Sequence, residues 1–378
     1  MPVKVLVVDD SIVVRRLVTT ALQENEDIEI VGSASNGKLA IDQAEKLEPD
    51  VITLDIEMPE MNGLEALKIL RKRFPKIAVV MFSTLTQHGA KVTVEALTIG
   101  AADYVTKPAN VGSVQESVNV LREELVPKVI ALGCNSSVER SGMGKASSQI
   151  AQLAGMGVQK AAIGTQFAGA QRPTITPTEV QAVVIGVSTG GPDALAKLMP
   201  TIPKHFAVPI CIVQHMPPVF TRLLAERLNQ ESEIDVVEGA PGMTLEPGKA
   251  IIAPGDFHME LRRLGSRSVV SLNQHDKENS CRPAVDVLFR SASNLFKNKV
   301  IGVVLTGMGQ DGLLGTDVLR NNGGYTIAQD KETSVVWGMP GAVASANLAD
   351  EILPIEQIGG RLSTLTGSVS ASRTKVNQ

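Results

Sequence analysis

The sequence predicts an α/β protein with two doubly wound parallel-sheet domains that are joined by a flexible linker. At 378 residues, the chain is longer than one hydrophobic core usually supports. Short apolar runs alternate with helical patterns in two separate regions, and this alternation is typical of parallel sheets. Between these regions the composition changes to Ser, Gly, Ala and Gln, which favours a linker.

The first domain is expected at residues 1–123 and the linker at 124–178, with a marginal helix around Gln149–Leu153. Five apolar runs in β–α order are the predicted strands of the first sheet: Val3–Val8, Ile28–Ser33, Val51–Leu54, Ile77–Phe82 and Asp103–Val105.

The second domain is expected at residues 179–365, and residues 366–378 are expected to form a frayed polar tail. Its predicted strands are again short apolar runs bounded by turn residues: Ala182–Val187, Val208–Val213, Ala250–Ala253, Val269–Leu272, Val300–Leu305 and Tyr325–Ala328.

Composition excludes several classes of protein. The formal charge of −4 and the lack of a dense basic run argue against a nucleic-acid surface. No stretch has transmembrane length, and the N-terminus is typical of a strand rather than a signal peptide. The cysteines are scattered, which suits a reducing compartment: Cys134, Cys211 and Cys281. We therefore expect a soluble cytoplasmic protein.

Acidic side chains follow two strands of the first domain. Asp9 and Asp10 come after the first strand, and Asp55 comes after the third. Because the carboxyl ends of parallel strands share one edge of the sheet, the three carboxylates are expected to converge. Like charges raise one another's pKa unless a cation neutralises them, and Mg²⁺ prefers such oxygen ligands.

Two further groups complete this pocket. Ser83 ends the fourth strand, and Lys107 precedes Pro108 after the fifth. Taken singly, each residue has an ordinary explanation: Asp10 or Ser11 caps a helix, and Lys107 is a solvated surface residue. Together, an aspartate nucleophile, a metal, a hydroxyl and an ammonium indicate phosphoryl transfer to a carboxylate.

A serine marks the start of the second domain. The segment Gly186–Gly190 fits the G-x-S-x-G pattern, in which a tight strand-to-helix turn exposes the hydroxyl of Ser188. The following helix would direct N–H groups toward a developing oxyanion. Serine is a poor nucleophile until a base takes its proton and a third group orients that base.

One histidine has a suitable position for the base. His215 directly follows the apolar run that ends at Val213, so it is expected at the same sheet edge as Ser188, unlike His205, His258 and His275. Judged alone, His215 is explained equally well as a helix-entry residue before Pro217 and Pro218.

The orienting acid is predicted in a glycine-rich loop. Asp311 lies shortly after the strand Val300–Leu305, although an isolated Asp-Gly is an ordinary turn. Asp330 is the rival, but it lies beside Lys331 and is expected to be more solvated. The glycines around Met308 free its backbone N–H to act as an oxyanion donor, which is a hypothesis.

The first domain resembles the receiver domain of two-component response regulators. The resemblance rests on four motifs: Asp9-Asp10-Ser11, Asp55-Ile56-Glu57-Met58-Pro59-Glu60-Met61-Asn62-Gly63, Ser83-Thr84 and Val105-Thr106-Lys107-Pro108. It implies that Asp55 accepts a phosphoryl group from a phosphohistidine on a sensor kinase. It also implies a Mg²⁺ site and phosphoryl-sensing residues: Asp10, Asp55 and the Glu57 carbonyl as ligands with Asp9 assisting, and Ser83 and Lys107 as sensors. Tyr104 matches the aromatic switch position, and a half-buried strand residue is an equal alternative.

The second domain resembles the Rossmann-like catalytic domain of the chemotaxis protein-glutamate methylesterase family (CheB). The motifs that carry this resemblance are Gly186–Gly191, Gln214–Pro218, Ile252–Met259, Cys281–Pro283, Thr306–Gly312 and Gly338–Gly341. It implies hydrolysis of glutamate γ-methyl esters on chemoreceptors with release of methanol, commonly deamidation of receptor glutamines, and no cofactor for the esterase reaction. Ser188 would be the nucleophile, His215 the base and Asp311 its partner, although the order Ser-His-Asp differs from that of α/β-hydrolases.

The two resemblances together imply how the enzyme is regulated and which partners it has, and the sequence also allows rival functions to be weighed. The unphosphorylated receiver is expected to cover the Ser188 cleft, and phosphorylation of Asp55 to weaken that packing. The linker is longer than in many members of the family. The partners implied are chemoreceptors and a sensor histidine kinase, without nucleic acid and with membrane contact only through the receptors.

Rival functions for the second domain are less favoured. A DNA-binding output domain would be shorter and basic. A nucleotide-binding output domain is disfavoured because this chain lacks the G-x-G-x-x-G spacing. A non-catalytic, phospho-dependent receptor-binding module stays open.

Overall fold

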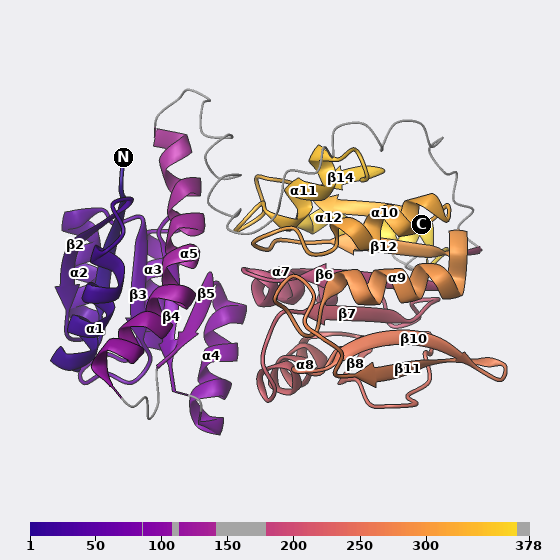
Figure 1. Cartoon of the computed structure of the whole chain (residues 1–378), viewed down its shortest axis with the longest axis horizontal. Helices are drawn as coiled ribbons and strands as arrows, with labels where there is room; N and C mark the ends of the chain where they lie inside the picture. The colour runs from indigo at the N-terminus through magenta and orange to yellow at the C-terminus, as the bar shows by residue number, and fades with distance from the viewer. Residues whose placement is uncertain (85, 108–112, 141–178, 369–378) are drawn as a thin grey trace, which may run out of the picture. The chain divides into compact units, whose positions relative to one another are not determined.

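The computed structural model describes residues 1–84, 86–107, 113–140 and 179–368 (Figure 1). The chain forms two compact units, whose described parts are residues 1–140 and 179–368. Both units have a parallel sheet with helices on its faces, so the predicted fold class is confirmed.

The sheet of the first unit has five parallel strands in the order β2-β1-β3-β4-β5. Their bounds match the predicted apolar runs to within a residue or so: β1 Val3–Val8, β2 Ile28–Ala34, β3 Val51–Asp55, β4 Ala78–Ser83 and β5 Asp103–Thr106. All side chains of β3 are buried, as expected for a strand that helices cover on both faces.

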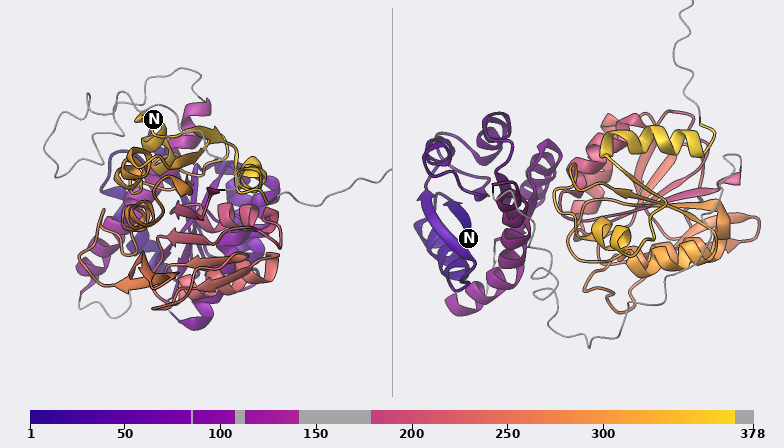
Figure 2. Two further views of the ribbon diagram at one scale, coloured as in Figure 1. Left: turned by 90° about the vertical axis from the view of Figure 1, so that its right-hand side faces the viewer. Right: turned by 90° about the horizontal axis from the view of Figure 1, so that it is seen from above.

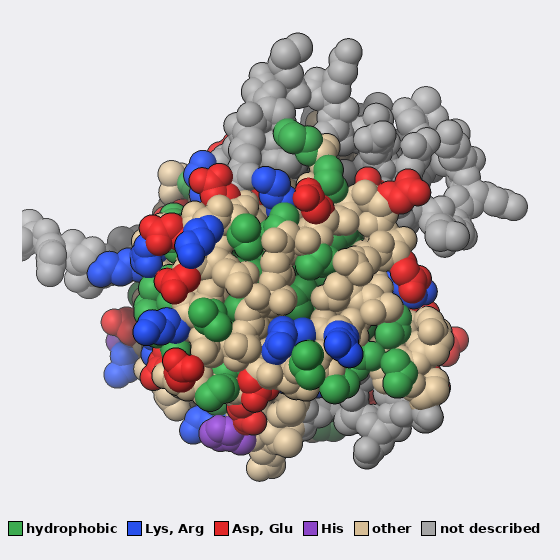
Figure 3. All heavy atoms as spheres, turned by 90° about the vertical axis from the view of Figure 1, so that its left-hand side faces the viewer, with side chains coloured by type: hydrophobic (Ala, Val, Ile, Leu, Met, Phe, Trp, Pro, Cys, Tyr) green, Lys and Arg blue, Asp and Glu red, His purple; other side chains and the backbone are tan. Residues whose placement is uncertain are grey.

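Five helices connect and cover these strands (Figures 1 and 2): α1 Ile12–Gln23, α2 Gly37–Leu47, α3 Gly63–Arg73, α4 Gln87–Ile99 and α5 Val114–Arg140. Polar side chains at Ser11, Asn36, Asn62 and Thr86 accept the first free N–H groups of α1 to α4. On the face of this unit drawn in Figure 3, acidic and basic side chains are interspersed.

The predicted start of the linker at residue 124 is wrong, because α5 continues to Arg140. Leu125, Val129 and Leu132 are buried and keep this part of the helix packed on the first unit. Pro127 lies inside α5, and a proline removes one helical hydrogen bond. Burial of the apolar side chains offsets that loss, which the sequence pattern did not indicate. The expected helix at Gln149–Leu153 lies outside the described residues.

The second unit has a seven-stranded parallel sheet in the order β14-β13-β12-β6-β7-β9-β8. Its strands are β6 Ala182–Val187, β7 Ile210–Gln214, β8 Asp235–Glu238, β9 Lys249–Ile252, β12 Val300–Val304, β13 Tyr325–Gln329 and β14 Glu351–Leu353. On one side the chain runs from β6 to β7, then to the edge strand β8, and returns to β9 between β7 and β8; it then crosses to β12 and builds outward through β13 to β14. The crevice between β6 and β12 is therefore the topological switch point, where α/β sheets bind ligands.

Helices cover both faces of this sheet (Figure 2): α7 Gly191–Leu198, α8 Phe220–Glu231, α9 Val285–Phe296, α10 Leu313–Asn321, α11 Met339–Ser345 and α12 Ile355–Leu365, with 3₁₀ turns η2 Met199–Thr201 and η3 Lys297–Lys299. Every side chain of β6 is buried, so the strand that carries the serine turn runs through the middle of the core.

At the edges of this unit, one predicted strand is confirmed but pairs differently from the others, and one predicted boundary is wrong. The run Val269–Leu272 is not in the parallel sheet, because it belongs to β11 (Arg267–Asn273), which pairs antiparallel with β10 (His258–Leu264). A turn at Gly265 with φ 59° reverses the chain there. The tail does not begin at residue 366, because Thr366 and Ser368 are buried. Within the described residues, no helix is long and apolar enough to cross a membrane.

Candidate functional site

Ser188 lies directly after β6 in a turn that backbone contacts hold from two sides. Its N–H donates to the Thr306 carbonyl at 3.0 Å, and its carbonyl accepts the Gly191 N–H at 2.8 Å. The Gln214 side chain also donates to that carbonyl at 3.0 Å. Gly190 has φ 75°, a conformation that disfavours other residues. The strand-to-helix turn expected from the glycine pattern is therefore present.

His215 lies beside this turn, because its backbone N–H donates to the Val187 carbonyl at 3.2 Å. Its Nε2 atom is 2.8 Å from Asp311 Oδ2, and its Nδ1 atom is 3.6 Å from the Cys281 sulfur. The structure thus brings His215 and Asp311 together. Across the described parts of the chain, the Ser188 hydroxyl has no hydrogen-bond partner, so no bond to His215 is formed. Bonds of this kind often form only when substrate is present.

Asp311 is buried and well supplied with donors. Its carboxylate accepts the Val285 N–H at 2.7 Å, the Asp286 N–H at 3.0 Å and the Asn279 side-chain amide at 2.8 Å, besides His215. Burial alone would raise the pKa of Asp311, but the hydrogen bonds to His215 and the backbone hold it below the usual value. Asp311 is therefore an ionised acceptor suited to orienting an imidazole.

The electrostatics of His215 favour its protonated form. Burial would lower the pKa of this imidazole, but the hydrogen bonds to Asp311 and Cys281 outweigh burial and raise the pKa to about 10. A base works best when its pKa is near the working pH. In this arrangement His215 is held as a cation between Asp311 and Cys281, and it can act as a base only after it has lost one proton.

The rival acid, Asp330, does not reach His215. Its Oδ1 atom accepts the backbone N–H of Thr333 at 3.0 Å and the Thr333 hydroxyl at 2.6 Å. Asp330 therefore caps the turn after β13, and the geometry favours Asp311 as the partner of the imidazole.

Gly307 brings the loop after β12 against the serine. A Cβ atom at this position would lie 2.8 Å from the Ser188 Cβ, so only glycine fits. The next residue, Met308, has 36% of its surface exposed, and its backbone N–H has no acceptor among the described residues. Gly309 follows with φ 84°. A free N–H is thus present beside Ser188.

Three neighbours of this site were missed by sequence reasoning: Asn279, Cys281 and Asp286. They come from the loop and helix after β11, and not from the end of a strand. The Cys281–Pro283 motif was a signal for the cysteine, but no pattern indicated contacts that span 32 residues, such as Asn279 to Asp311.

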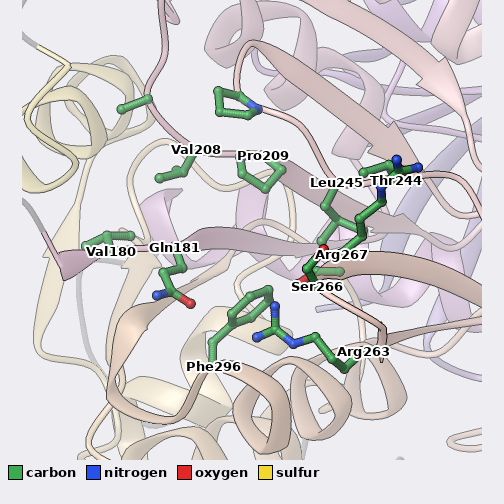
Figure 4. Close-up of a pocket in the computed structure, with 13 residues that line it drawn as sticks. Val180, Gln181, Val208, Pro209, Thr244, Leu245, Arg263, Ser266, Arg267 and Phe296 are labelled. Atoms are coloured by element: carbon green, nitrogen blue, oxygen red, sulfur yellow. The ribbon is translucent and has the colours of Figure 1, made fainter.

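A hollow of about 450 Å³ lies elsewhere in the same unit (Figure 4). Val180 and Pro209 line it just before β6 and β7, and Phe296 and Arg263 lie on its wall. Ser188 and His215 follow the other ends of these strands. This hollow is therefore separate from the serine turn.

In the first unit, the acidic cluster expected at the sheet edge is present. One ligand atom each of Asp9, Asp10 and Asp55 lie within 4.8 Å of one another. The Lys107 ammonium bridges two of them, at 2.9 Å from Asp9 Oδ2 and 2.7 Å from Asp55 Oδ1. Asp9 and Asp55 are buried, whereas Asp10 is exposed.

Burial dominates the electrostatics of this cluster. It raises the pKa of Asp55 from 3.8 to about 6, and the hydrogen bond to Lys107 offsets only part of the increase. Burial would lower the pKa of Lys107, but hydrogen bonds to Asp55 and Asp9 raise it. The Oδ2 atom of Asp55 is buried without a hydrogen-bond partner among the described residues. Such an oxygen favours a further ligand.

The remaining expected residues surround this cluster. Ser83 is buried, its backbone carbonyl accepts the Lys107 N–H at 2.7 Å, and its hydroxyl accepts that of Thr93 at 2.6 Å. Glu57 is exposed and borders a small cavity with Asp55 and Lys107.

Tyr104 is buried, with 8% of its surface exposed. The Lys128 ammonium lies 5.3 Å from its ring centroid and donates to its carbonyl at 2.6 Å.

Comparison with known families defines the class of the protein. Residues 5–119 match the response regulator receiver domain, and residues 183–362 match the CheB methylesterase family. The chain is therefore a response regulator whose output domain is a hydrolase, and the enzyme is favoured over a non-catalytic binding module.

Near full-length relatives narrow the class to one family. The protein-glutamate methylesterase/protein-glutamine glutaminase of Trichodesmium erythraeum (strain IMS101) is 46% identical over 358 residues, which are 94% of this chain and 96% of the relative. The protein of the same name from Thermotoga maritima is 41% identical and covers 95% and 97%. A crystal structure of the T. maritima CheB methylesterase catalytic domain is 46% identical, with TM-score 0.49, and covers 49% of this chain and 98% of that one. The chain belongs to the CheB family of protein-glutamate methylesterase/protein-glutamine glutaminase proteins.

Proposed function

We propose that the second unit hydrolyses glutamate γ-methyl esters on chemoreceptors in the cytoplasm, releasing methanol, and deamidates receptor glutamines by the same chemistry. The observation that carries this proposal is the 2.8 Å contact between His215 and Asp311 beside the serine turn, at the switch point of the sheet. The names of the relatives support the substrate class.

In the proposed mechanism, His215 first loses its extra proton to solvent, and the neutral imidazole then takes the hydroxyl proton while the Ser188 oxygen attacks the ester carbonyl. The Met308 N–H stabilises the oxyanion of the tetrahedral intermediate. When that intermediate collapses, His215 returns the proton to the departing methoxide, and methanol leaves. Water, activated by the same imidazole, then hydrolyses the acyl-enzyme to the glutamate carboxylate.

Asp311 has two roles in this scheme. Its hydrogen bond to Nε2 leaves Nδ1 as the proton-accepting nitrogen, and its charge stabilises the imidazolium formed after proton transfer. The contact of Nδ1 with Cys281 has to be exchanged for one with Ser188. We propose that substrate binding drives this exchange.

The first unit controls this activity in our proposal. Asp55 accepts a phosphoryl group from a phosphohistidine of a sensor kinase, and Lys107 and Ser83 contact the transferred group. The orphaned Asp55 oxygen and the nearby Asp10 fit a magnesium site, completed by the Glu57 carbonyl and assisted by Asp9. Bound Mg²⁺ would neutralise charge on the phosphoryl oxygens. Tyr104 is proposed to report the phosphorylated state.

The decisive test is methanol release from methylated receptor membranes. Ser188→Ala should reduce release to the background, whereas the control Ser266→Ala, at an exposed position lining the separate hollow, should match the wild type. Equal release by Ser188→Ala and wild type would contradict the serine mechanism. No release by any of them would favour the binding module.

Regulation needs a second comparison. Residues 178–378 alone should release methanol faster than the unphosphorylated full chain. If the isolated domain is no faster, inhibition by the receiver is wrong.

A further inference from the structure

We infer that Asp286 and Asn279 are positioning residues for the reaction proposed above, because they hold Asp311 against His215 from the side remote from the imidazole. The inference rests on the proposed function and extends it to residues that the strand-end motifs do not include.

The two oxygens of Asp311 have different partners. Oδ2 faces His215 at 2.8 Å and accepts the Val285 N–H at 2.7 Å. Oδ1 accepts the Asp286 N–H at 3.0 Å and the Asn279 amide at 2.8 Å. The plane of the carboxylate is therefore fixed by contacts to both oxygens, and the direction of Oδ2 depends on what holds Oδ1.

The Asp286 side chain ties together the two elements that meet here. Its Oδ1 accepts the N–H groups of Gly312 at 3.0 Å and Gly315 at 2.6 Å, at the start of α10. Its Oδ2 accepts the Asn279 amide at 2.9 Å. Asp286 is fully buried in α9, yet its carboxylate makes no contact with His215. It fixes the segment that carries Asp311 and does not meet the reacting groups itself.

Asn279 bridges the two carboxylates. Its amide nitrogen lies 2.8 Å from Asp311 and 2.9 Å from Asp286, so each of its two hydrogens has its own acceptor. The residue has φ 50°, a conformation that asparagine tolerates better than most residues. Its neutral double donor keeps two carboxylates close without a cation between them.

Asp286 and Asn279 act on the charge of Asp311 in opposite directions. Burial and the charge of Asp311 raise the pKa of Asp286 to about 6, so above that pH it places a second negative charge near the pair. The negative charge of Asp286 raises the pKa of His215. The Asn279 donor stabilises the Asp311 carboxylate, makes it a weaker hydrogen-bond acceptor and so lowers the pKa of His215. The other ionisable groups that face the network are Cys281 on His215, and Arg290 of α9 with its partner Glu278.

The test measures kcat and KM for methanol release against pH, using full-length variants. Asp286→Asn should lower kcat by about 10- to 100-fold with KM unchanged, because misplacement of a remote support costs this much. The acid limb of its pH profile, where kcat falls as His215 becomes protonated, should move to lower pH. The reason is that a full negative charge is lost near His215, which lowers the pKa of the imidazole. In this variant Asn279 must turn away from the new amide, but a full charge outweighs one amide dipole.

Asn279→Ala should also lower kcat, but its acid limb should move to higher pH, because Asp311 loses a donor. Asn279 is exposed to solvent, so this variant is expected to fold and decides the matter if Asp286→Asn does not. The matched control is Asp276→Asn, which removes an exposed carboxylate from the same loop and should leave kcat and the acid limb unchanged.

Acid limbs that move in opposite directions support the inference. Shifts in the same direction, no shift, or a change confined to KM would overturn it. If Ser188→Ala is inactive but Asp286→Asn and Asn279→Ala behave like the wild type, only this inference fails. If Ser188→Ala is fully active, the proposed function fails first.

Discussion

Asp55 and Asp311 occupy matching places in the two units, yet burial affects them in opposite ways. Asp55 is the last residue of the central strand β3, and Asp311 lies in the loop after the central strand β12. Each is almost fully buried and contacts one basic side chain, Lys107 or His215. The pKa of Asp55 is raised to about 6, whereas that of Asp311 is lowered. Burial is the largest influence on both, so the difference lies in the hydrogen bonds.

The number of backbone donors explains the contrast. Asp311 accepts N–H groups from Val285, Asp286 and Gly312, besides a side-chain amide. Asp55 accepts one backbone N–H, that of Ile56, and one of its oxygens has no partner among the described residues. Hydrogen bonds to the charged form lower a carboxyl pKa. Both Asp311 oxygens thus have donors within the protein, whereas one Asp55 oxygen remains available to a ligand.

The largest effect on catalysis should come from removing the negative charge of Asp311 at the hydrolase site. Asp311→Asn should lower kcat for methanol release by about 10⁴-fold, the scale known for the orienting aspartate of a catalytic triad. Phosphorylation of Asp55 by acetyl phosphate, measured in parallel, should be unchanged. A loss below tenfold would mean that Asp311 does not orient His215.

The same Asp→Asn substitution at Asp55 of the receiver should affect phosphorylation. Asp55→Asn should abolish incorporation of phosphate from acetyl phosphate, because the acceptor oxygen is lost. Asp10→Asn should weaken incorporation without removing the acceptor. Full incorporation by Asp55→Asn would place the acceptor on another residue.

The raised pKa of Asp55 has a consequence for stability. A carboxyl whose folded pKa lies above its unfolded value stabilises the fold at low pH, and the benefit is lost as pH rises through the folded pKa. For Asp55 the window is pH 3.8 to about 6, and the change is at most about 3 kcal/mol in the free energy of unfolding. Calorimetry across this window should show a larger dependence in the wild type than in Asp55→Asn, which keeps only the dependence due to other groups such as Asp286. Equal pH dependence in both would refute it.

The smallest effect concerns the cysteine beside the imidazole. Cys281→Ala removes an acceptor that raises the pKa of His215, so the acid limb of kcat should move to lower pH. The pH profile of methanol release, with the buried Cys211→Ala as a control, measures this shift. A limb that stays in place would mean that Cys281 does not influence His215.

Much of the fold and of both candidate sites could be predicted from the residues that follow the predicted strands. Ser188, His215 and Asp311 were predicted at one edge because each follows an apolar run, and parallel pairing places such ends together. The structure confirms the fold and the contact between His215 and Asp311, but their catalytic roles stay predictions. The same reasoning placed Asp9, Asp55 and Lys107 in one pocket.

What could not be predicted depends on packing and not on periodicity. Asn279 and Asp286 reach Asp311 from a loop and a helix whose direction no pattern specified. The run at β11 looks the same whether it pairs parallel or antiparallel, and a turn residue, Gly265, decided the outcome. In α5, burial of apolar side chains offsets the hydrogen bond lost at Pro127, so the helix continues past the predicted start of the linker at residue 124.

The order of strands in the second unit also affects how the protein is synthesised. β6 is made first but lies between β7 and β12, and β12 begins only at Val300. During translation, one edge of the serine-bearing strand stays unpaired until more than a hundred further residues have emerged, and unpaired edges promote aggregation. The receiver is complete long before then. A ribosome that stalls before Val300 would therefore release a folded receiver with an unfinished hydrolase, which needs a chaperone or a protease.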